Sequence, residues 1–129
     1  MNFYIKQNST MPLLKFPLTQ KLMEKYGITA DMLEGVAVTF SMINIETGNY
    51  KIANVTSNLV ICPDRATNPS EEYYTLTHMF KLSDTNKPGR YSGEFVLDFL
   101  CEGCGKLKLP TESEINIIIS GSITKTSVV

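Results

Sequence analysis

The chain has 129 residues, of which 43% are hydrophobic and 19% are charged, and its formal net charge is −1. These values are typical of one ordinary globular domain and exclude the basic stripe of a nucleic-acid-binding protein or an attraction to anionic membranes. No stretch reaches the ~20 apolar residues of a membrane span, and the first residues do not have the pattern of a signal peptide. With three cysteines, an odd number, we expect a reducing compartment.

The N-terminal part of the chain predicts a strand, an extended segment and a short helical insertion. Residues 3–7 alternate apolar and polar side chains, which indicates a strand. The segment 11–18 contains two prolines, so we expect it at a sheet edge or as extended backbone. Thr19 is a predicted N-cap and Gly27 a predicted C-cap, and a second helical turn follows. We therefore expect one or two short helices near residues 19–34, as a lid on an open end of the fold.

The remaining chain predicts strands separated by turns, with a hairpin turn at residues 46–49. Alternating apolar and polar side chains predict strands at residues 36–43, 50–53, 57–62, 73–82, 91–100, 106–109 and 115–119. Together with the first strand, this gives seven to eight short strands at near-regular spacing. The pattern predicts an all-β fold, an immunoglobulin-like antiparallel β-sandwich in a single domain over residues 1–129.

The segment 73–120 is the part around which we expect the sandwich to be organised. Strands 73–82 and 91–100 are predicted to pair as an antiparallel ribbon. The polar turn 83–90 between them contains Pro-Gly, which allows the chain to reverse. The apolar run 115–119 is the predicted closing strand.

The sequence Cys101-Glu-Gly-Cys104 is the motif most suited to metal binding or redox chemistry. A tetrahedral zinc site needs four ligands, usually from two such pairs. Only Cys62 and the single histidine, His78, could complete it here. A zinc-binding module with Cys62, His78, Cys101 and Cys104 is therefore a minor alternative. The favoured interpretation is a β-turn with two partly buried thiols, without metal or cofactor. The sequence leaves open whether Cys101 and Cys104 instead bind a metal or form a disulfide.

Catalytic groups are not predicted. His78 alternates with core-type residues, and no nucleophile elbow or oxyanion motif accompanies it. Glu94 and Asp98 share a strand face but lie about 13 Å apart, too far for paired acid–base chemistry. No phosphate-binding glycine loop occurs. We expect a protein that is not an enzyme; a solvent-filled cleft with His78 hydrogen-bonded to a thiol or hydroxyl would contradict this.

A carbohydrate- or receptor-binding sandwich is the other alternative function. It requires an exposed aromatic platform, for which Tyr73, Tyr74 and Tyr91 are the clustered candidates.

The order of segments resembles a known family. The motif residues are Asp84, Pro88, Gly89, Tyr91, Glu94 and Phe95. They resemble the aspartate, proline-glycine-x-tyrosine, glutamate-phenylalanine hairpin of the N-terminal immunoglobulin-like domain of phage baseplate upper proteins. The prolyl segment 5–13 and the Leu-x-Gly before strand 36–42 fit the same pattern. The sequence departs from it in having Asn8-Ser9 where Gly-Asp is expected, and in the extra helix after Thr19.

The resemblance implies a non-enzymatic bacteriophage virion structural protein. It would be an adaptor or anchor between fibre, baseplate, neck or capsid components, and similar domains anchor the head fibres of tailed phages, including crAss-like phages. Its localisation would be the virion, after assembly in the host cytoplasm. Residues 11–18 and 124–129 are the candidate docking arms. The expected partners are other virion proteins and further copies of this chain, with no nucleic acid and no membrane.

Overall fold

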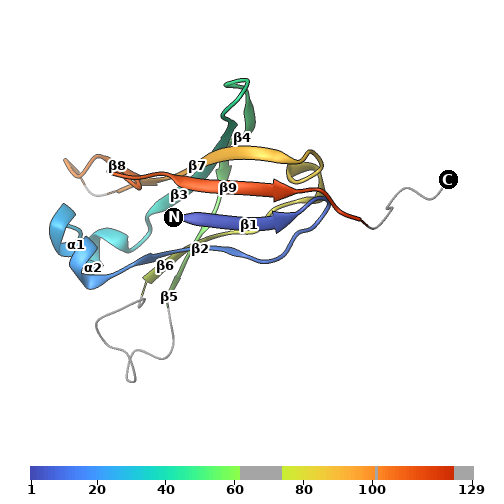
Figure 1. Cartoon of the computed structure of the whole chain (residues 1–129). Coiled ribbons are helices and arrows are strands. Elements are labelled where there is room, and N and C mark those ends of the chain that lie inside the picture. The colour runs from blue at the N-terminus through green and yellow to red at the C-terminus, as the bar shows by residue number, and fades with distance from the viewer. Residues whose placement is uncertain (62–73, 101, 124–129) are drawn as a thin grey trace.

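The computed structural model describes residues 1–61, 74–100 and 102–123, and its strands form two sheets (Figure 1). In chain order, the elements are β1 (Asn2–Lys6), β2 (Leu14–Leu18), α1 (Gln20–Tyr26), α2 (Ala30–Leu33), β3 (Ala37–Asn44), β4 (Tyr50–Thr56), β5 (Asn58–Ile61), β6 (Tyr74–His78), the 3₁₀ helix η1 (Leu82–Asp84), β7 (Gly89–Asp98), β8 (Lys106–Leu109) and β9 (Ile115–Ser120). The predicted all-β sandwich with short helices near residues 19–34 is confirmed.

The larger sheet has the order β1-β9-β7-β3-β4, with β8 also paired to β7. Strand β7 is ten residues long, so its first half pairs with β9 and its second half with β8. Strand β1 runs parallel to β9, whereas the other pairs in this sheet are antiparallel. The expectation of a wholly antiparallel sandwich is therefore wrong at this edge, where the first and last described strands meet.

The smaller sheet has the order β2-β6-β5 and is antiparallel throughout. The chain passes between the two sheets after β1, after β2, after β4 and after β6. This exchange of strands is the Greek-key connectivity of an immunoglobulin-like sandwich. The described residues form nine strands rather than seven or eight, because segment 14–18 is a strand in its own right.

The predicted ribbon of strands 73–82 and 91–100 does not form. Strand β6 belongs to the smaller sheet and β7 to the larger one, so the connection between them is a crossover instead of a hairpin. The family-like motif that begins at Asp84 lies on this crossover and on β7. The closing strand is predicted correctly, since β9 pairs with β7.

Inward-facing side chains of both sheets form one core. Its centre is Phe40 on β3, which is fully buried. The Phe40 ring lies 4.9 Å from the ring of Phe95, 6.0 Å from that of Phe80 and 4.5 Å from that of His78, as measured between centroids. Burial of such rings is the main stabilising term for a domain of this size, because each removes a large apolar area from water.

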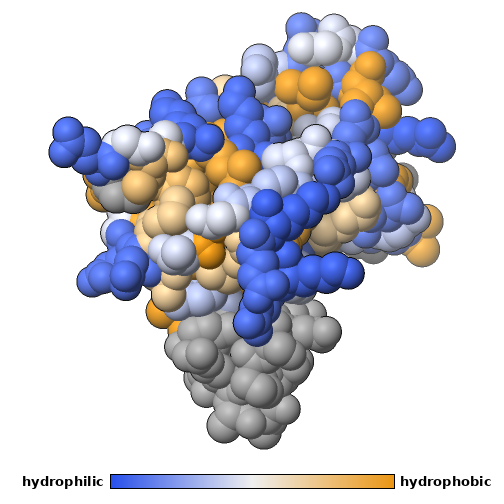
Figure 2. All heavy atoms as spheres, turned by 90° about the vertical axis from the view of Figure 1, so that its left-hand side faces the viewer, coloured by the Kyte–Doolittle hydropathy of each residue, from blue (hydrophilic) through white to orange (hydrophobic). Residues whose placement is uncertain are grey.

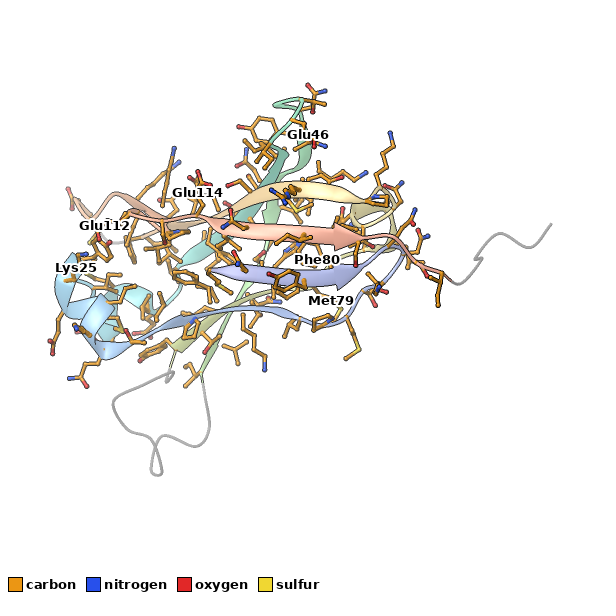
Figure 3. The ribbon with its side chains drawn as sticks, viewed as in Figure 1. Lys25, Glu46, Met79, Phe80, Glu112 and Glu114 are labelled. Atoms are coloured by element: carbon orange, nitrogen blue, oxygen red, sulfur yellow. The ribbon has the colours of Figure 1, made fainter. Side chains whose placement is uncertain are left out.

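The two helices close one end of the sandwich, as the sequence predicts (Figure 1). The Thr19 hydroxyl accepts a hydrogen bond from the Leu22 amide, and Gly27 ends α1 in the left-handed conformation, at φ 68°. Partly buried side chains of both helices pack on the core. Lys25 forms an ion pair with Glu112 at 2.6 Å and so joins α1 to the β8–β9 turn (Figure 3). Figure 2 views this end, where hydrophobic residues lie between hydrophilic ones.

The opposite corner is held by Thr85, which follows η1 and is fully buried. Its hydroxyl donates to the Ser9 carbonyl at 2.8 Å and accepts from the Ser9 amide at 3.2 Å. The Thr85 carbonyl accepts from the Asn8 amide at 3.0 Å. Asn8 has φ 60°, the left-handed region that glycine and asparagine tolerate best. This explains how asparagine can stand where the family resemblance leads one to expect glycine.

Replacing Thr85 with valine should lower the free energy of unfolding by about 1–2 kcal/mol. Valine keeps the shape but leaves the partly buried amide and carbonyl of Ser9 without their partner. Urea denaturation of both proteins measures the difference. Thr47→Val in the exposed β3–β4 turn is the matched control and should change stability by less than about 0.5 kcal/mol. Equal effects at the two positions would contradict the corner's role.

Candidate binding surface

A groove of about 610 Å³ crosses the outer face of the larger sheet. Its floor is formed by the outward side chains of β3 and β7, one wall by β4, and the other by β8 and the turn before β9. The lining residues are Ser41, Ile43, Tyr50, Asn54, Ser92, Gly93, Glu94, Val96, Lys106, Lys108, Pro110, Ser113 and Glu114. Hollows of about 410, 310 and 200 Å³ elsewhere on the described part of the chain are smaller.

Irregular pairing between β3 and β4 shapes one wall of the groove. The register of this pair shifts after Phe40 and again after Met42. Asn54 has φ 51°, and its backbone amide donates a hydrogen bond to the Ser41 hydroxyl at 2.9 Å. Such bulges bend a strand pair and increase its twist. The β3–β4 hairpin accordingly rises from the sheet, with Glu46 near its tip (Figures 1 and 3).

The side chains in the groove lie in rows across the sheet. Tyr50 on β4 is opposite Ile43 on β3, and Ile43 is opposite Ser92 on β7. Two residues earlier on β3, Ser41 is opposite Glu94 on β7. Side chains at alternate positions of a strand share a face and lie about 7 Å apart. The exposed ring of Tyr50 and the exposed carboxylate of Glu94 therefore occupy neighbouring rows of one surface.

The motif residues of the family resemblance divide between corner, core and groove. The Asp84 carboxylate accepts from the Lys81 amide at 2.8 Å and so closes η1, and Gly89 begins β7 at φ 153°. The Tyr91 hydroxyl donates to the Lys87 carbonyl at 2.9 Å, while its ring is buried. Phe95 is in the core, whereas Glu94 lies in the groove, and Pro88 is exposed. Of the six, only Glu94 thus contributes to the candidate surface.

The aromatic platform expected from Tyr73, Tyr74 and Tyr91 is not present in the form predicted. Tyr91 is only 3% exposed and Tyr74 is half-buried against the core. Tyr73 lies outside the described residues. The tyrosine that an outer-face ligand would meet is Tyr50, which is 68% exposed. Its position could have been suspected from the strand that follows the predicted turn at residues 46–49.

The cysteine motif is only partly described. Cys62 and Cys101 lie outside the described residues, and Cys104 takes part in a disulfide, so the prediction of a thiol at Cys104 is wrong. Among the described residues, no group of three or more histidine, cysteine or acidic side chains is arranged to hold a metal ion. The zinc alternative with Cys62, His78, Cys101 and Cys104 gains no support.

His78 at the end of β6 is 4% exposed and stacks on the Phe40 ring. Its Nδ1 atom and the Ser57 hydroxyl share a hydrogen bond of 2.8 Å, which the sequence did not reveal. A cleft of about 200 Å³ adjoins the pair. A cleft beside a hydrogen bond between His78 and a hydroxyl is the arrangement named above as contradicting the expectation of a protein that is not an enzyme, and the pair has the composition of a nucleophile and its base. However, Ser57 is only 7% exposed, and the buried Nε2 has no hydrogen-bond partner among the described residues, so nothing there orients the ring for proton transfer.

The hydrogen bond of this pair joins the β4–β5 link to the core. Burial lowers the pKa of His78 below its ordinary value of 6.5, and nearby Lys81 lowers it further, while Asp84 opposes the shift. The folded protein consequently prefers the neutral imidazole.

Acidification should destabilise the fold through His78. Between the unfolded pKa of about 6.5 and the lower folded pKa, only the unfolded chain binds the proton, so the free energy of unfolding falls as the pH drops. His78→Gln cannot titrate and should have a shallower pH dependence. Urea denaturation at pH 7.5 and pH 5 measures both slopes. Parallel slopes for the two proteins would contradict the assignment.

A second feature is the side of the sandwich where the chain passes from β4 to β5, here called the open side and defined by Tyr50–Thr56 and Asn58–Ile61. Strand β4 is an edge of the larger sheet and β5 an edge of the smaller one. In the described part of the chain, no strand pairs with the outer edge of either. The exposed fractions of Val55, Val60 and Ile61 are 37%, 45% and 55%. Unpaired edges with apolar side chains are sites where another chain can add a strand.

The candidate docking arm 11–18 is built into the fold. Leu14–Leu18 is strand β2, with Leu14 and Leu18 in the core. It lies at the edge of the smaller sheet, as the two prolines predict, and Pro17 interrupts its row of amide donors. A docking role for this segment remains a prediction. A partner would have to bind the outer edge of strand β2, because residues 14–18 are not a free arm. Residues 124–129, the other candidate arm, lie outside the described residues.

Strand order and surface together define an immunoglobulin-like β-sandwich with a groove on its larger sheet and an open side. Comparison with known proteins gives no match to any family model, any curated protein or any solved structure. No helix among the described residues has the length and apolar character needed to cross a membrane.

Proposed function

We propose that this chain is a non-enzymatic bacteriophage virion structural protein, an adaptor that joins fibre, baseplate, neck or head components. Two considerations support the proposal. One is the resemblance of the motif from Asp84 to Phe95 to phage baseplate upper proteins. The other is the open side, which offers two strand edges at which a neighbouring virion protein could dock.

The open side is the main structural support for the proposal, because a partner strand added at its edges would gain affinity through backbone hydrogen bonds. The edge formed by β2 is less suited to this, since Pro17 has no amide hydrogen to donate. Val60 and Ile61 on β5 add apolar surface for the partner to cover. The partner is another virion protein or a further copy of the chain, and light scattering of the purified protein measures self-association.

Mass spectrometry of purified particles tests the virion role. The particles come from the phage whose genome encodes the chain, and the peptides of this chain should be present in fixed ratio to the capsid protein. Genes for capsid, portal or tail proteins should adjoin its own. Absence from washed, genome-filled particles would contradict the proposal.

A charge placed on the open side tests the docking mode. Val60→Lys puts a solvated ammonium on the edge of β5, and lysine on an edge strand opposes pairing. We expect this variant to fold but to be lost from assembled particles. Leu100→Lys is the matched control, because Leu100 is 69% exposed and follows β7 outside any strand edge. Normal incorporation of Val60→Lys would exclude β5 as the docking edge.

The Ser57–His78 pair allows a direct test of the non-enzymatic assignment. A fluorophosphonate probe labels an activated serine, and a Ser57→Ala variant would abolish such labelling. We expect no labelling of the native chain, because Ser57 is buried. Labelling that Ser57→Ala removes would favour a hydrolase.

A further inference from the structure

We propose that the groove on the outer face of the larger sheet is a binding site for a neutral oligosaccharide, with Tyr50 as its stacking platform. The groove lies on the face of the larger sheet, whereas the proposed docking uses strand edges of the open side; the two share strand β4, which carries Tyr50 and Asn54.

The volume and shape of the groove suit a chain of sugar rings. Its volume of about 610 Å³ lies within the roughly 300–1,000 Å³ of small-molecule sites. It is not an enclosed cavity, and its walls come from the raised β3–β4 hairpin on one side and from β8 on the other (Figure 1). An open groove of this kind accepts a segment of a longer polymer, whereas an enclosed cavity accepts only a small molecule.

The charges in the groove favour an uncharged ligand. The lining contains two lysines, Lys106 and Lys108, and two glutamates, Glu94 and Glu114. Its formal charge is therefore zero, which gives no net attraction to a phosphate, a nucleic acid or a polycation. Lys106 also has a partner outside the groove, since its Nζ lies 3.9 Å from the Asp98 carboxylate.

The hydrogen-bonding groups fit the hydroxyls of a sugar. The Ser41 hydroxyl and Asn54 already hydrogen-bond each other. Of the other lining groups, the serine hydroxyls at 92 and 113 both donate and accept, the lysines donate and the carboxylates accept. A sugar hydroxyl is itself a donor and an acceptor, so it can pair with each of these groups. An apolar ligand would leave them without partners in a desolvated groove, at a cost for each group.

Tyr50 provides the apolar surface that a sugar ring needs. Its side chain is 68% exposed and lies opposite Ile43, whose half-buried side chain extends the apolar patch. One face of a pyranose ring is made of C–H groups that can stack on an aromatic ring, while its hydroxyls point to the sides. Glu94 lies in the next row and two strands across the sheet, about 12 Å from Tyr50 by strand geometry, so its carboxylate is an acceptor for a further ring of the oligosaccharide.

An array of immobilised neutral and sialylated glycans, probed with the purified full chain, tests the proposal. We expect binding to at least one neutral glycan, and calorimetric titration with the soluble form of that glycan then measures the affinity. Tyr50→Ala should weaken it at least about 10-fold, which corresponds to about 1.4 kcal/mol. Glu94→Gln should weaken it as well, because it removes the charge-assisted acceptor.

Matched controls distinguish the groove from the rest of the surface. Tyr4→Ala changes a tyrosine of similar exposure, 64%, that is not in the groove, and Glu46→Gln changes a glutamate on the raised hairpin (Figure 3). Both should leave the affinity within about twofold. Unchanged thermal melting of Tyr50→Ala ensures that loss of binding is not loss of fold. The proposal is overturned if no neutral glycan binds, if only sialylated glycans bind, or if Tyr4→Ala weakens binding as much as Tyr50→Ala.

Discussion

Replacing Phe40 with alanine should lower the free energy of unfolding by about 3–5 kcal/mol. Phe40 is fully buried at the centre of the core, and its ring contacts the rings of His78, Phe80 and Phe95. The truncation removes apolar area from the core and leaves a cavity that rigid aromatic neighbours cannot fill. Because small domains are stable by only about 5–15 kcal/mol, the loss is a large fraction of the total stability.

Urea denaturation followed by far-ultraviolet circular dichroism measures the change. Tyr4→Ala removes an aromatic ring of similar size from a position that is 64% exposed, so it should cost less than about 0.5 kcal/mol. A loss below about 1.5 kcal/mol for Phe40→Ala would mean that the two sheets do not pack around this ring.

Replacing Gly93 with alanine should cost about 2–3 kcal/mol, although it adds only one methyl group. Gly93 lies on β7 with its face toward the core, and a Cβ there would lie 2.8 Å from Cζ of Phe40 and 2.9 Å from Cδ1 of Ile117. Both neighbours are fully buried and cannot turn away into solvent. The packing of Phe40 thus requires the absence of a side chain at residue 93.

A double-mutant cycle tests this cause. Phe40→Leu removes the ring atoms that a Cβ at residue 93 would meet, so Gly93→Ala should cost less in that background than in the native protein. Gly121→Ala is the control, since a Cβ there meets only a Pro88 carbon at 4.0 Å. Additive effects of the two core substitutions would show that Gly93 is needed for another reason.

The local elements follow directly from the sequence. Thr19 and Gly27 delimit α1 because a hydroxyl can accept from a free amide and glycine can adopt positive φ. Along β7, every second residue from Tyr91 to Phe99 is buried, as the alternation predicts. Strand β4 extends to Thr56, beyond the predicted end at residue 53, because a bulge at Asn54 interrupts its alternation without ending the pairing.

The connection between β6 and β7 shows where sequence patterns become insufficient. Both strands alternate correctly, yet they pair in different sheets. Alternation tells which side chains share a face, but it carries no information about which strand lies alongside. The length of the connection was the usable signal, because hairpin loops usually have 2–5 residues and residues 79–88 exceed that range.

The candidate sites depend on such long-range pairing. The groove is lined by Tyr50, Glu94 and Lys108, among others. These residues come from three strands and share one surface only because β4, β7 and β8 belong to one sheet. Ser57 reaches His78 because the chain changes sheets beside the end of β6. Sequence by itself determined the helix caps, most strands and their inward faces, since these depend on neighbouring residues. The tertiary structure alone decided the strand partners, the crossover, the burial of Tyr91 and the groove, since these depend on packing between segments far apart in the chain.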